Sequence, residues 1–509
     1  MAQDSVLRVG EVRLLERGAA GLPLMERAGL AAAEIARERI AARSASVQVL
    51  AGPGNNGGDA LVVARLLKSW YFDVEVAFAS DAERFAGDAA AAWRAWNACG
   101  GITRTQWSNA DEPGLIVDGL FGIGLARDIG APHAQWIARA NHGAAPVLAL
   151  DIPSGLNADT GCAGEHTMRA DATATFIALK PGLLTADGPD HCGTISVHTL
   201  GLDIAGAEPT RGRRLRWQAL RESLPETLWR RRHNVHKGTF GTLSILGGSD
   251  GMVGAPFLAG RAALRLGAGK VRLGLAGGVP LAVDWQMPEL MIEAAQRVLA
   301  ASCDALVVGP GLGDDASARA ALAQALAAPT PLVIDAGALN LIAADASLGS
   351  MLATRAAATA ITPHPAEAAR LLQCDTDSIQ SDRVDAALRL AARFNAATVL
   401  KGAGSVLAFT DGTWAINASG SAALASAGTG DVLAGMIGAF LAQGIAVDEA
   451  LALAVSLHGA AADSLVEGGR GPLGLVASEL APEASRLINA ATRNGRATGQ
   501  RVPPYDPRT

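Results

Sequence analysis

Apolar and polar positions along the first part of the chain predict helices and strands in alternation. Apolar side chains recur at helical spacing from residue 5 to residue 43, which predicts one long helix. The short apolar run Val47–Ala51 predicts a buried strand, and a second helix is expected over Ala60–Trp70. Further strands are expected at Val74–Ala79, Leu115–Asp118, Val147–Asp151, Thr173–Ile177 and Thr194–Val197. This order favours an α/β fold with a mainly parallel sheet covered on both faces.

The second half of the chain repeats the alternation, which predicts another doubly wound sheet. Strands are expected at Thr242–Leu246, Lys270–Leu275, Ala305–Val308, Pro331–Asp335, Ala360–Thr362, Thr398–Leu400 and Val406–Phe409. Helices are expected at 255–267, 315–328, 366–373, 378–395, 429–443 and 448–467. Ligands of such sheets bind beyond the carboxyl ends of the strands, so polar residues at those ends carry the functional information.

The character of the chain changes between Ala205 and His236, where arginines gather. They are Arg211, Arg213, Arg214, Arg216, Arg230, Arg231 and Arg232. A site for an anion or an interdomain contact is one interpretation, and a solvated linker with a short helix is the interpretation we favour. We therefore place a boundary near residue 208, which gives domains 1–207 and 208–509.

Composition narrows the class of protein. Half of the 509 residues are hydrophobic, and the net charge of −6 argues against a nucleic-acid partner. The five cysteines form no Cys-x-x-Cys pair, which fits a reducing compartment and argues against a disulfide framework. Charged residues interrupt the first twenty positions, which leaves no room for a signal peptide. The apolar run Val432–Val447 is short for a membrane span, and we expect it to be a buried helix. We expect a cytoplasmic protein with no membrane partner.

The loop Gly52–Asp59 follows a predicted strand and opens a predicted helix. Its sequence Gly-Pro-Gly-Asn-Asn-Gly-Gly-Asp combines close-approach glycines with polar side chains, and free N–H groups at a helix start attract anions. A tight turn with Asp59 as the helix N-cap is the alternative. Two similar loops, 118–128 and 151–157, begin with the strand-end aspartates Asp118 and Asp151. Together the three loops favour a polar ligand site.

These loops resemble those of the NAD(P)HX epimerase family, also known as the YjeF N-terminal domain. The resemblance covers residues 11–203 and includes the opening Leu24–Gly29 and the turn Lys180–Leu183. It implies a Rossmann-like domain. It also implies that the hydrated nucleotide contacts Asn55, Asn56, Gly57, Gly58, Asp59, Gly122, Ile123, Gly124, Leu125, Ala126, Arg127, Asp128 and Asp151.

The same resemblance implies a potassium ion held by Asn56, Asp118 and Ser154. Asp151 precedes Ser154 by three residues, so the ion would also fix this candidate catalytic acid/base. Two positions depart from the family pattern: Ala60 stands where glycine is usual, and Ile123 where threonine is common.

In the second half, Ala427–Gly435 leads small residues into an apolar helix with Asp431 at its start. Backbone N–H groups of this turn are suited to a phosphate or a developing oxyanion, and Asp431 to accepting a proton from a hydroxyl group. An N-capped buried helix is the alternative, but it leaves the Gly-Thr-Gly unexplained. Lys401–Ser405, His364 between two prolines, and Gly309–Gly313 also follow predicted strands.

These motifs resemble the ADP/ATP-dependent NAD(P)HX dehydratase family, from about His236 to residue 485, which implies a ribokinase-like fold. By this resemblance the hydrated nucleotide contacts Ala255, Gly311, His364 and Asp431. The adenine nucleotide contacts Lys401, Gly402, Ala403, Gly404, Ser405 and Gly430. The chain departs from the family pattern at Ser421, Ala423, Ala427 and Gly337.

Both resemblances imply one repair task. Water added to the nicotinamide of NADH or NADPH leaves a C6 hydroxyl in R or S configuration; an isomerase would interconvert the two, and a lyase would remove the hydroxyl after phosphorylating it. The fused order resembles the bacterial arrangement, so we expect Mg²⁺ with ADP, giving AMP and phosphate, and a homo-oligomer. Two alternatives stay open. One is a ribokinase-like kinase of a small metabolite, and the presence of the first domain argues against it. The other is a non-catalytic nucleotide-binding scaffold, and the presence of Asp431, Asp151 and Asn56 argues against it.

Overall fold

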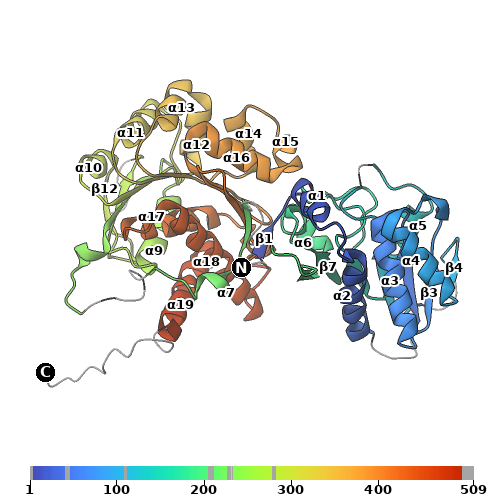
Figure 1. The fold of residues 1–509 in the computed structure, drawn as a ribbon. Helices are drawn as coiled ribbons and strands as arrows, with labels where there is room; N and C mark the ends of the chain where they lie inside the picture. The colour runs from blue at the N-terminus through green and yellow to red at the C-terminus, as the bar shows by residue number, and fades with distance from the viewer. Residues whose placement is uncertain are drawn as a thin grey trace, which may run out of the picture. The chain divides into compact units, whose positions relative to one another are not determined.

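A computed structural model of the chain divides it into two compact units, Met1–Arg213 and Arg214–Thr509 (Figure 1). The structure describes residues 4–40, 46–107, 112–125, 127–204, 211–225, 228, 231, 233–277 and 283–495. The boundary expected after residue 207 falls among 205–210, outside the described residues, and the division found lies a few residues later.

A seven-stranded parallel sheet forms the centre of the first unit, in the order β4-β3-β2-β5-β6-β7-β8. Its strands are β2 (Val47–Ala51), β3 (Val74–Ala77), β4 (Ile102–Arg104), β5 (Leu115–Gly119), β6 (Val147–Leu150), β7 (Ala172–Phe176) and β8 (Thr194–His198). The chain leaves β2 toward β3 and returns on the other side as β5. This reversal of strand order is the switch point at which doubly wound sheets bind ligands.

Helices cover both faces of this sheet, as the sequence predicts. One face packs Val49 and Val117 against α2 (Leu24–Arg39), α3 (Asn55–Ser69) and α4 (Gly87–Ala98). The other face packs Leu50 and Ile116 against α5 (His133–His142). The remaining elements are α1 (Val9–Gly18), η2 (Ala82–Arg84), η3 (Pro181–Leu183) and α6 (Gly188–His191).

Two predictions for this unit are wrong. The helix expected over residues 5–43 is β1 (Ser5–Val6), α1 and α2, because Gly21 has φ 98° and Pro23 follows, and both break a helix. The helix expected from Ala60 begins at Asn55 instead, with Gly54 as its N-cap. Asp59 therefore lies inside the helix and is not its N-cap.

The second unit contains a larger mixed sheet, which runs β18-β17-β16-β15-β14-β13-β10-β11-β12. Its strands are β10 (Thr242–Gly247), β11 (Lys270–Leu275), β12 (Met291–Ala294), β13 (Ala305–Val308), β14 (Leu332–Ile334), β15 (Thr359–Ile361), β16 (Ala397–Leu400), β17 (Val406–Ala408) and β18 (Trp414–Asn417). All neighbours from β12 to β16 are parallel, whereas β17 and β18 are antiparallel additions. The switch point lies between β10 and β13.

Figure 1 shows helices on both faces of this sheet. One layer contains α9 (Gly254–Arg265), α17 (Thr429–Ala442), α18 (Val447–Glu467) and α19 (Ala477–Gly495). The other contains α10 (Ala295–Ala300), α11 (Ala316–Ala327), α12 (Gly337–Ala344), α13 (Ala346–Ala353), α14 (Pro365–Leu372), α15 (Thr376–Ser381) and α16 (Arg383–Phe394). Short 3₁₀ turns are η4 (Lys237–Phe240) and η5 (Ala422–Leu424). The helix expected at 378–395 is split, because Asp382 caps a new helix there.

Of the described helices, α18 is long and apolar enough to cross a membrane by composition, but 72% of its most apolar window is buried within the protein. The run Val432–Val447 is not one helix, since α17 ends at Ala442. At the junction, β9 (Gly212–Leu215) pairs antiparallel with β1, and α7 (Trp217–Leu220) follows. The expected short helix is therefore present, but part of the expected linker is a strand; Arg230 and Arg232 lie outside the described residues.

Candidate active sites

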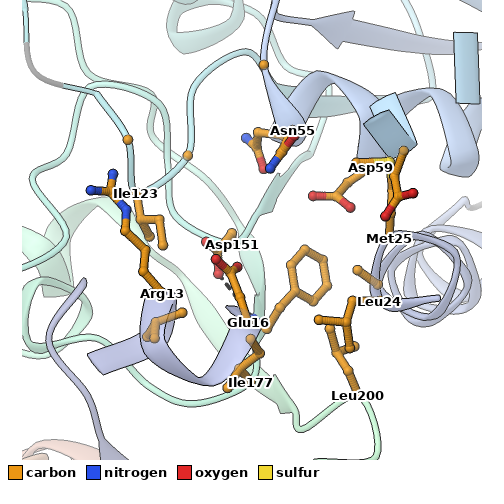
Figure 2. Close-up of a pocket in the computed structure, with 18 of the residues that line it drawn as sticks. Arg13, Glu16, Leu24, Met25, Asn55, Asp59, Ile123, Asp151, Ile177 and Leu200 are labelled. Carbon is orange, nitrogen blue, oxygen red and sulfur yellow. Dashed lines mark hydrogen bonds between the residues drawn. The ribbon is translucent and has the colours of Figure 1, made fainter. Parts of the chain in front are cut away.

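A cavity of about 910 Å³ opens at the carboxyl edge of the first unit's sheet, beyond the paired strands β2 and β5 (Figure 2). Of the predicted contacts, Asn55, Asn56, Asp59, Gly122, Ile123, Gly124, Leu125, Arg127 and Asp151 line it. Asp128 is exposed away from the lining, and Ala126 lies outside the described residues. Parallel strands thus bring three separate loops to one site, as expected from their strand-end positions.

The start of α3 forms one wall of this cavity. Asn55 and Asn56 occupy the first turn, where backbone N–H groups have no partner within the helix and favour an anion. Gly57 and Gly58 do not line the cavity but allow close packing. A Cβ on Gly57 would lie 1.8 Å from the Gly52 carbonyl oxygen, so the helix could not approach the strand so closely with any side chain there.

The predicted potassium ligands Asp118 and Ser154 are fully buried, and the third, Asn56, is nearly buried at the cavity wall. Ser154 Oγ donates to Asp118 Oδ1 at 2.7 Å, and Ser154 N donates to Asp118 Oδ2 at 2.8 Å. Burial nevertheless raises the pKa of Asp118 to about 6. Within the described residues no cation pairs with this carboxylate, and Asn56 Nδ2 is buried without a hydrogen-bond partner. The buried carboxylate of Asp118, the hydroxyl of Ser154 and the amide oxygen of Asn56 supply oxygen ligands of the kind that a monovalent cation takes, whereas the unpartnered Asn56 Nδ2 is a donor and would not ligate one.

Asp151 follows β6 in a left-handed conformation, φ 64°, which is unusual for a residue with a side chain and marks stored strain. Its carboxylate accepts hydrogen bonds from Lys180 Nζ, from Phe176 N at 3.2 Å and from Thr175 Oγ1 at 3.3 Å. Lys180 is completely buried and also donates to Thr175 Oγ1 and the Phe176 carbonyl. Asp151 is thus a fixed, ion-paired carboxylate at the cavity wall.

Sequence reasoning missed the contribution of α1. Arg13 and Glu16 of this helix both line the cavity, and Figure 2 shows Glu16 beside Asp151 and Arg13 extending toward Ile123. Partial burial, and then the charge of Asp151, raise the pKa of Glu16. Burial, and next Asp151, also raise the pKa of Asp59 well above its usual range. Helical spacing alone could not identify Arg13 and Glu16, because their direction depends on the break between α1 and α2.

In the second unit, carboxylates and a lysine meet at the carboxyl edge of the sheet. Asp335 follows β14, Lys401 follows β16, and Lys401 Nζ donates to Asp335 Oδ1 at 2.7 Å. Lys401 also lies beside the start of α17, since a Cβ on Gly430 would be 3.3 Å from its Nζ. Burial, followed by the charge of Asp335, raises the pKa of Asp431 to about 6, against the opposing effect of Lys401.

His364, between β15 and α14, lies at the same edge. Its Nδ1 accepts from Ala366 N at 3.2 Å as a helix cap, and its Nε2 lies 3.3 Å from Glu367 Oε1. Burial lowers the pKa of His364, an effect that the neighbouring Glu367 opposes. His364 is therefore a neutral, half-exposed group facing the charged cluster, with a capping role as well.

The other predicted contacts are distributed along this edge. Ala255 lies in the first turn of α9, and a Cβ on Gly311 would be 3.3 Å from the Ala255 methyl group at the switch point between β10 and β13. Residues 402–405 form the turn from β16 to β17. Sequence reasoning missed Asp335 as a site residue, although it is a strand-end aspartate like Asp118. It also missed Arg383, buried beneath this turn, which donates to the Lys401 carbonyl at 3.2 Å.

Two departures from the family patterns have structural explanations. Ala60 is fully buried, and its methyl group faces Gly119, which provides the space for it. Gly337 begins α12 where a Cβ would lie 2.1 Å from the Leu312 carbonyl oxygen, so this backbone excludes any side chain. Ser421 caps η5, Ala423 is buried, and Ala427 is exposed before α17. Ile123 lines the cavity of the first unit.

Two doubly wound units, each with convergent polar groups at a carboxyl edge, define a two-domain α/β enzyme that handles nucleotides. The family described as YjeF-related protein N-terminus matches residues 21–182, and the NAD(P)H-hydrate dehydratase family matches residues 243–482. The chain is 40% identical to the bifunctional NAD(P)H-hydrate repair enzyme Nnr of Escherichia coli, over 94% of this chain and 93% of that protein. It is 36% identical to the Nnr protein of Coxiella burnetii, over 96% and 99%.

The chain belongs to the family of bifunctional NAD(P)H-hydrate repair enzymes. Among solved structures it is similar to the ADP/ATP-dependent NAD(P)H-hydrate dehydratase of Bacillus subtilis, co-crystallised with ATP/Mg²⁺. That likeness has 34% identity and a TM-score of 0.47, and it covers 54% of this chain and 96% of the other.

Proposed function

We propose that this protein repairs hydrated NADH and NADPH, with an epimerase in the first unit and an ADP-dependent dehydratase in the second. The observation that carries the proposal is that the family relationship spans both units, each of which keeps its polar groups at the carboxyl edge of its sheet. Epimerisation makes both configurations of the C6 hydroxyl available to a dehydratase that accepts only the S form.

In the first unit, the N-terminal turn of α3 would bind the pyrophosphate, and Asp151 would exchange a proton with the C6 hydroxyl. Potassium fits the Asn56, Asp118 and Ser154 group, where it would neutralise a buried carboxylate and hold three loops together. The predicted contacts Gly57, Gly58 and Asp128 stay predictions; the first two support the shape of the wall and do not line it.

In the second unit, Asp431 would accept the proton of the C6 hydroxyl as its oxygen attacks the β-phosphorus of ADP. The new O–P bond forms, the bond to AMP breaks, and the N–H groups at the start of α17 stabilise the transferring phosphoryl group. The electron pair of the ring nitrogen then expels phosphate, and loss of a C5 proton restores the dihydronicotinamide. Lys401, fixed by Asp335, would neutralise phosphate charge.

Mg²⁺ would arrive with ADP. The described residues contain no group of three or more His, Cys, Asp or Glu side chains that could hold a metal alone. A magnesium ion bound to phosphates needs only one or two protein carboxylates, and Asp335 could supply one while Asp431 stays the proton acceptor. The ion would supply charge neutralisation of the transferring phosphoryl group.

The test mixes the protein with acid-generated NADH hydrate, containing both epimers, and ADP, and follows the return of NADH absorbance. Complete recovery supports the proposal. Recovery that stops when the S form is exhausted excludes the epimerase activity from the proposed function. No recovery, with phosphorylation of another small alcohol, supports the metabolite kinase, and binding without any turnover supports the nucleotide-binding scaffold.

A further inference from the structure

Two carboxyl groups of different character face each other in the first unit's cavity. Asp151 is tied to Lys180, whose ammonium group is completely buried and also donates to Thr175 and Phe176. A buried cation held in this way fixes the Asp151 carboxylate in one position, since separating the pair would leave an uncompensated charge. The bonds from Lys180, Phe176 and Thr175 all reach Oδ1 of Asp151, so Oδ2 is the atom that would accept a proton.

Glu16 has no such partner. Within the described part of the chain, no hydrogen bond or ion pair is recorded for its carboxyl group, which projects from α1 into the cavity (Figure 2). The charged groups that act on it are Asp151, which favours its protonated form, and Lys180, Arg13 and Arg17, which oppose this. The charges of Asp151 and Glu16 also raise the pKa of Asp59 on α3, so the three carboxyl groups are close enough to affect one another electrostatically. Like charges at close range are relieved when one group holds a proton.

The rest of the cavity wall is suited to a flat ring. Apolar side chains from three different parts of the unit complete the lining: Leu24, Met25, Phe176, Ile177 and Leu200. Asn55, in the first turn of α3, lies across the cavity from Glu16 (Figure 2). A dinucleotide with its pyrophosphate at the start of α3 would thus present one ring to the carboxyl groups.

We propose that Glu16 is a second catalytic residue of the epimerase, acting with Asp151 as an acid–base pair on the hydrated nicotinamide. The proposal rests on the function proposed above and adds a residue from a helix that carries no recognised motif. A pair of carboxyl groups that shares one proton can accept a proton at one group and donate from the other at two separate atoms of the substrate.

The chemistry is a reversible ring opening. Asp151 removes the proton of the C6 hydroxyl, a C6=O double bond forms, the C6–N1 bond breaks, and Glu16 protonates N1. Rotation about the C5–C6 bond turns the other face of the aldehyde toward N1. Ring closure then returns the N1 proton to Glu16 and the Asp151 proton to the hydroxyl oxygen. No oxidant, reductant or net proton is needed, and the pair ends in its starting state.

The experiment measures epimerisation and dehydration separately in the full chain. Glu16→Gln should lower the kcat of epimerisation about 10²-fold, the lower end of the effect of losing an acid–base group. Its KM should change by less than about threefold, since Glu16 acts in the transition state. Glu16→Asp should restore part of the rate. The matched control is Glu38→Gln, which removes an exposed carboxylate of α2 that does not line the cavity.

The pH profile separates a proton donor from a structural residue. The wild-type rate should fall as pH rises through the elevated pKa of Glu16. This basic limb should be absent from the residual rate of Glu16→Gln. A rate within about threefold of wild type, or a lowered rate with an unchanged pH profile, overturns the proposal. If the wild-type chain dehydrates the S epimer but never interconverts the epimers, the epimerase function itself fails, and this proposal fails with it.

Discussion

Replacing Asp431 with asparagine should abolish dehydration and at the same time stabilise the second unit. The carboxyl group is held in a site that raises its pKa from 3.8 to about 6, chiefly by burial and then by the charge of Asp335. One pKa unit corresponds to about 1.36 kcal/mol, so the ionised form costs up to about 3 kcal/mol at neutral pH. Partial exposure of Asp431 to solvent reduces this to about 1–2 kcal/mol.

The sign of the pH dependence follows from this elevated pKa. The folded state binds the proton more tightly than the unfolded chain, so the cost is fully present above about pH 6 and disappears as pH falls toward 3.8. Asp431→Asn should therefore gain stability near neutral pH and lose the gain in acid. Wild-type dehydration, which needs the ionised base, should fall about tenfold for each pH unit below about 6.

Urea unfolding of the second unit at several pH values, with dehydratase turnover on the S epimer, provides the assay. Loss of a general base lowers the rate about 10²–10⁴-fold. Asp377→Asn is a matched control, because Asp377 is an exposed acidic residue in the first turn of α15. If Asp431 only stabilises the start of its helix, the variant loses about 0.3–1 kcal/mol and keeps its turnover. That result would refute the reasoning.

Three further predictions follow from the same sites. Asp118→Ala should slow epimerisation and remove its response to potassium, while dehydration of the S epimer continues. The epimerisation rate is measured against potassium concentration at constant ionic strength. A variant that responds to potassium as the wild type does would exclude Asp118 as a ligand. Asp335→Asn should release Lys401 and raise the KM for ADP more than about tenfold. It should also move the acidic limb of the pH–rate profile for dehydration to lower pH. If Asp335 only terminates its strand, steady-state kinetics across pH would show neither change. Fragments 1–207 and 208–509 should each fold and retain their own activity, although the first loses the pairing of β1 with β9. Two insoluble or inactive fragments, beside an active full chain, would contradict this independence.

Most strands of the two sheets could be predicted from sequence because each is a short, apolar run, whereas β4, β12 and β18 were not predicted. The run Val47–Ala51, for example, is β2 without any change of bounds. The predicted helix over residues 5–43 failed because apolar spacing continues through Gly21 and Pro23, whose backbone preferences outweigh it. β12 was missed because it is partly exposed and too short for polar and apolar residues to alternate clearly.

In the candidate sites, too, sequence alone could place some residues and not others. Asp118 and Asp151 could be placed at the candidate site because each ends a predicted strand before a glycine-containing turn, and the carboxyl ends of parallel strands meet at one edge of a sheet. Glu16 and Lys180 could not be assigned roles, because each acts through a neighbour distant in sequence: Asp151 lies 29 residues from Lys180 and on a different element from Glu16. Arg383 looked like any charged residue of an amphipathic helix until its guanidinium was found buried beneath the Lys401 turn.

The most direct test of the two-unit account uses the purified R epimer of hydrated NADH as the sole substrate, with ADP and Mg²⁺. Only a chain that first inverts C6 and then removes the hydroxyl can form NADH from it. The account predicts steady NADH formation by the wild-type chain above the enzyme-free rate, accumulation of the S epimer in Asp431→Asn, and one AMP for each NADH. An R epimer that the wild-type chain leaves unchanged beyond the enzyme-free rate, with no NADH formed, would contradict it.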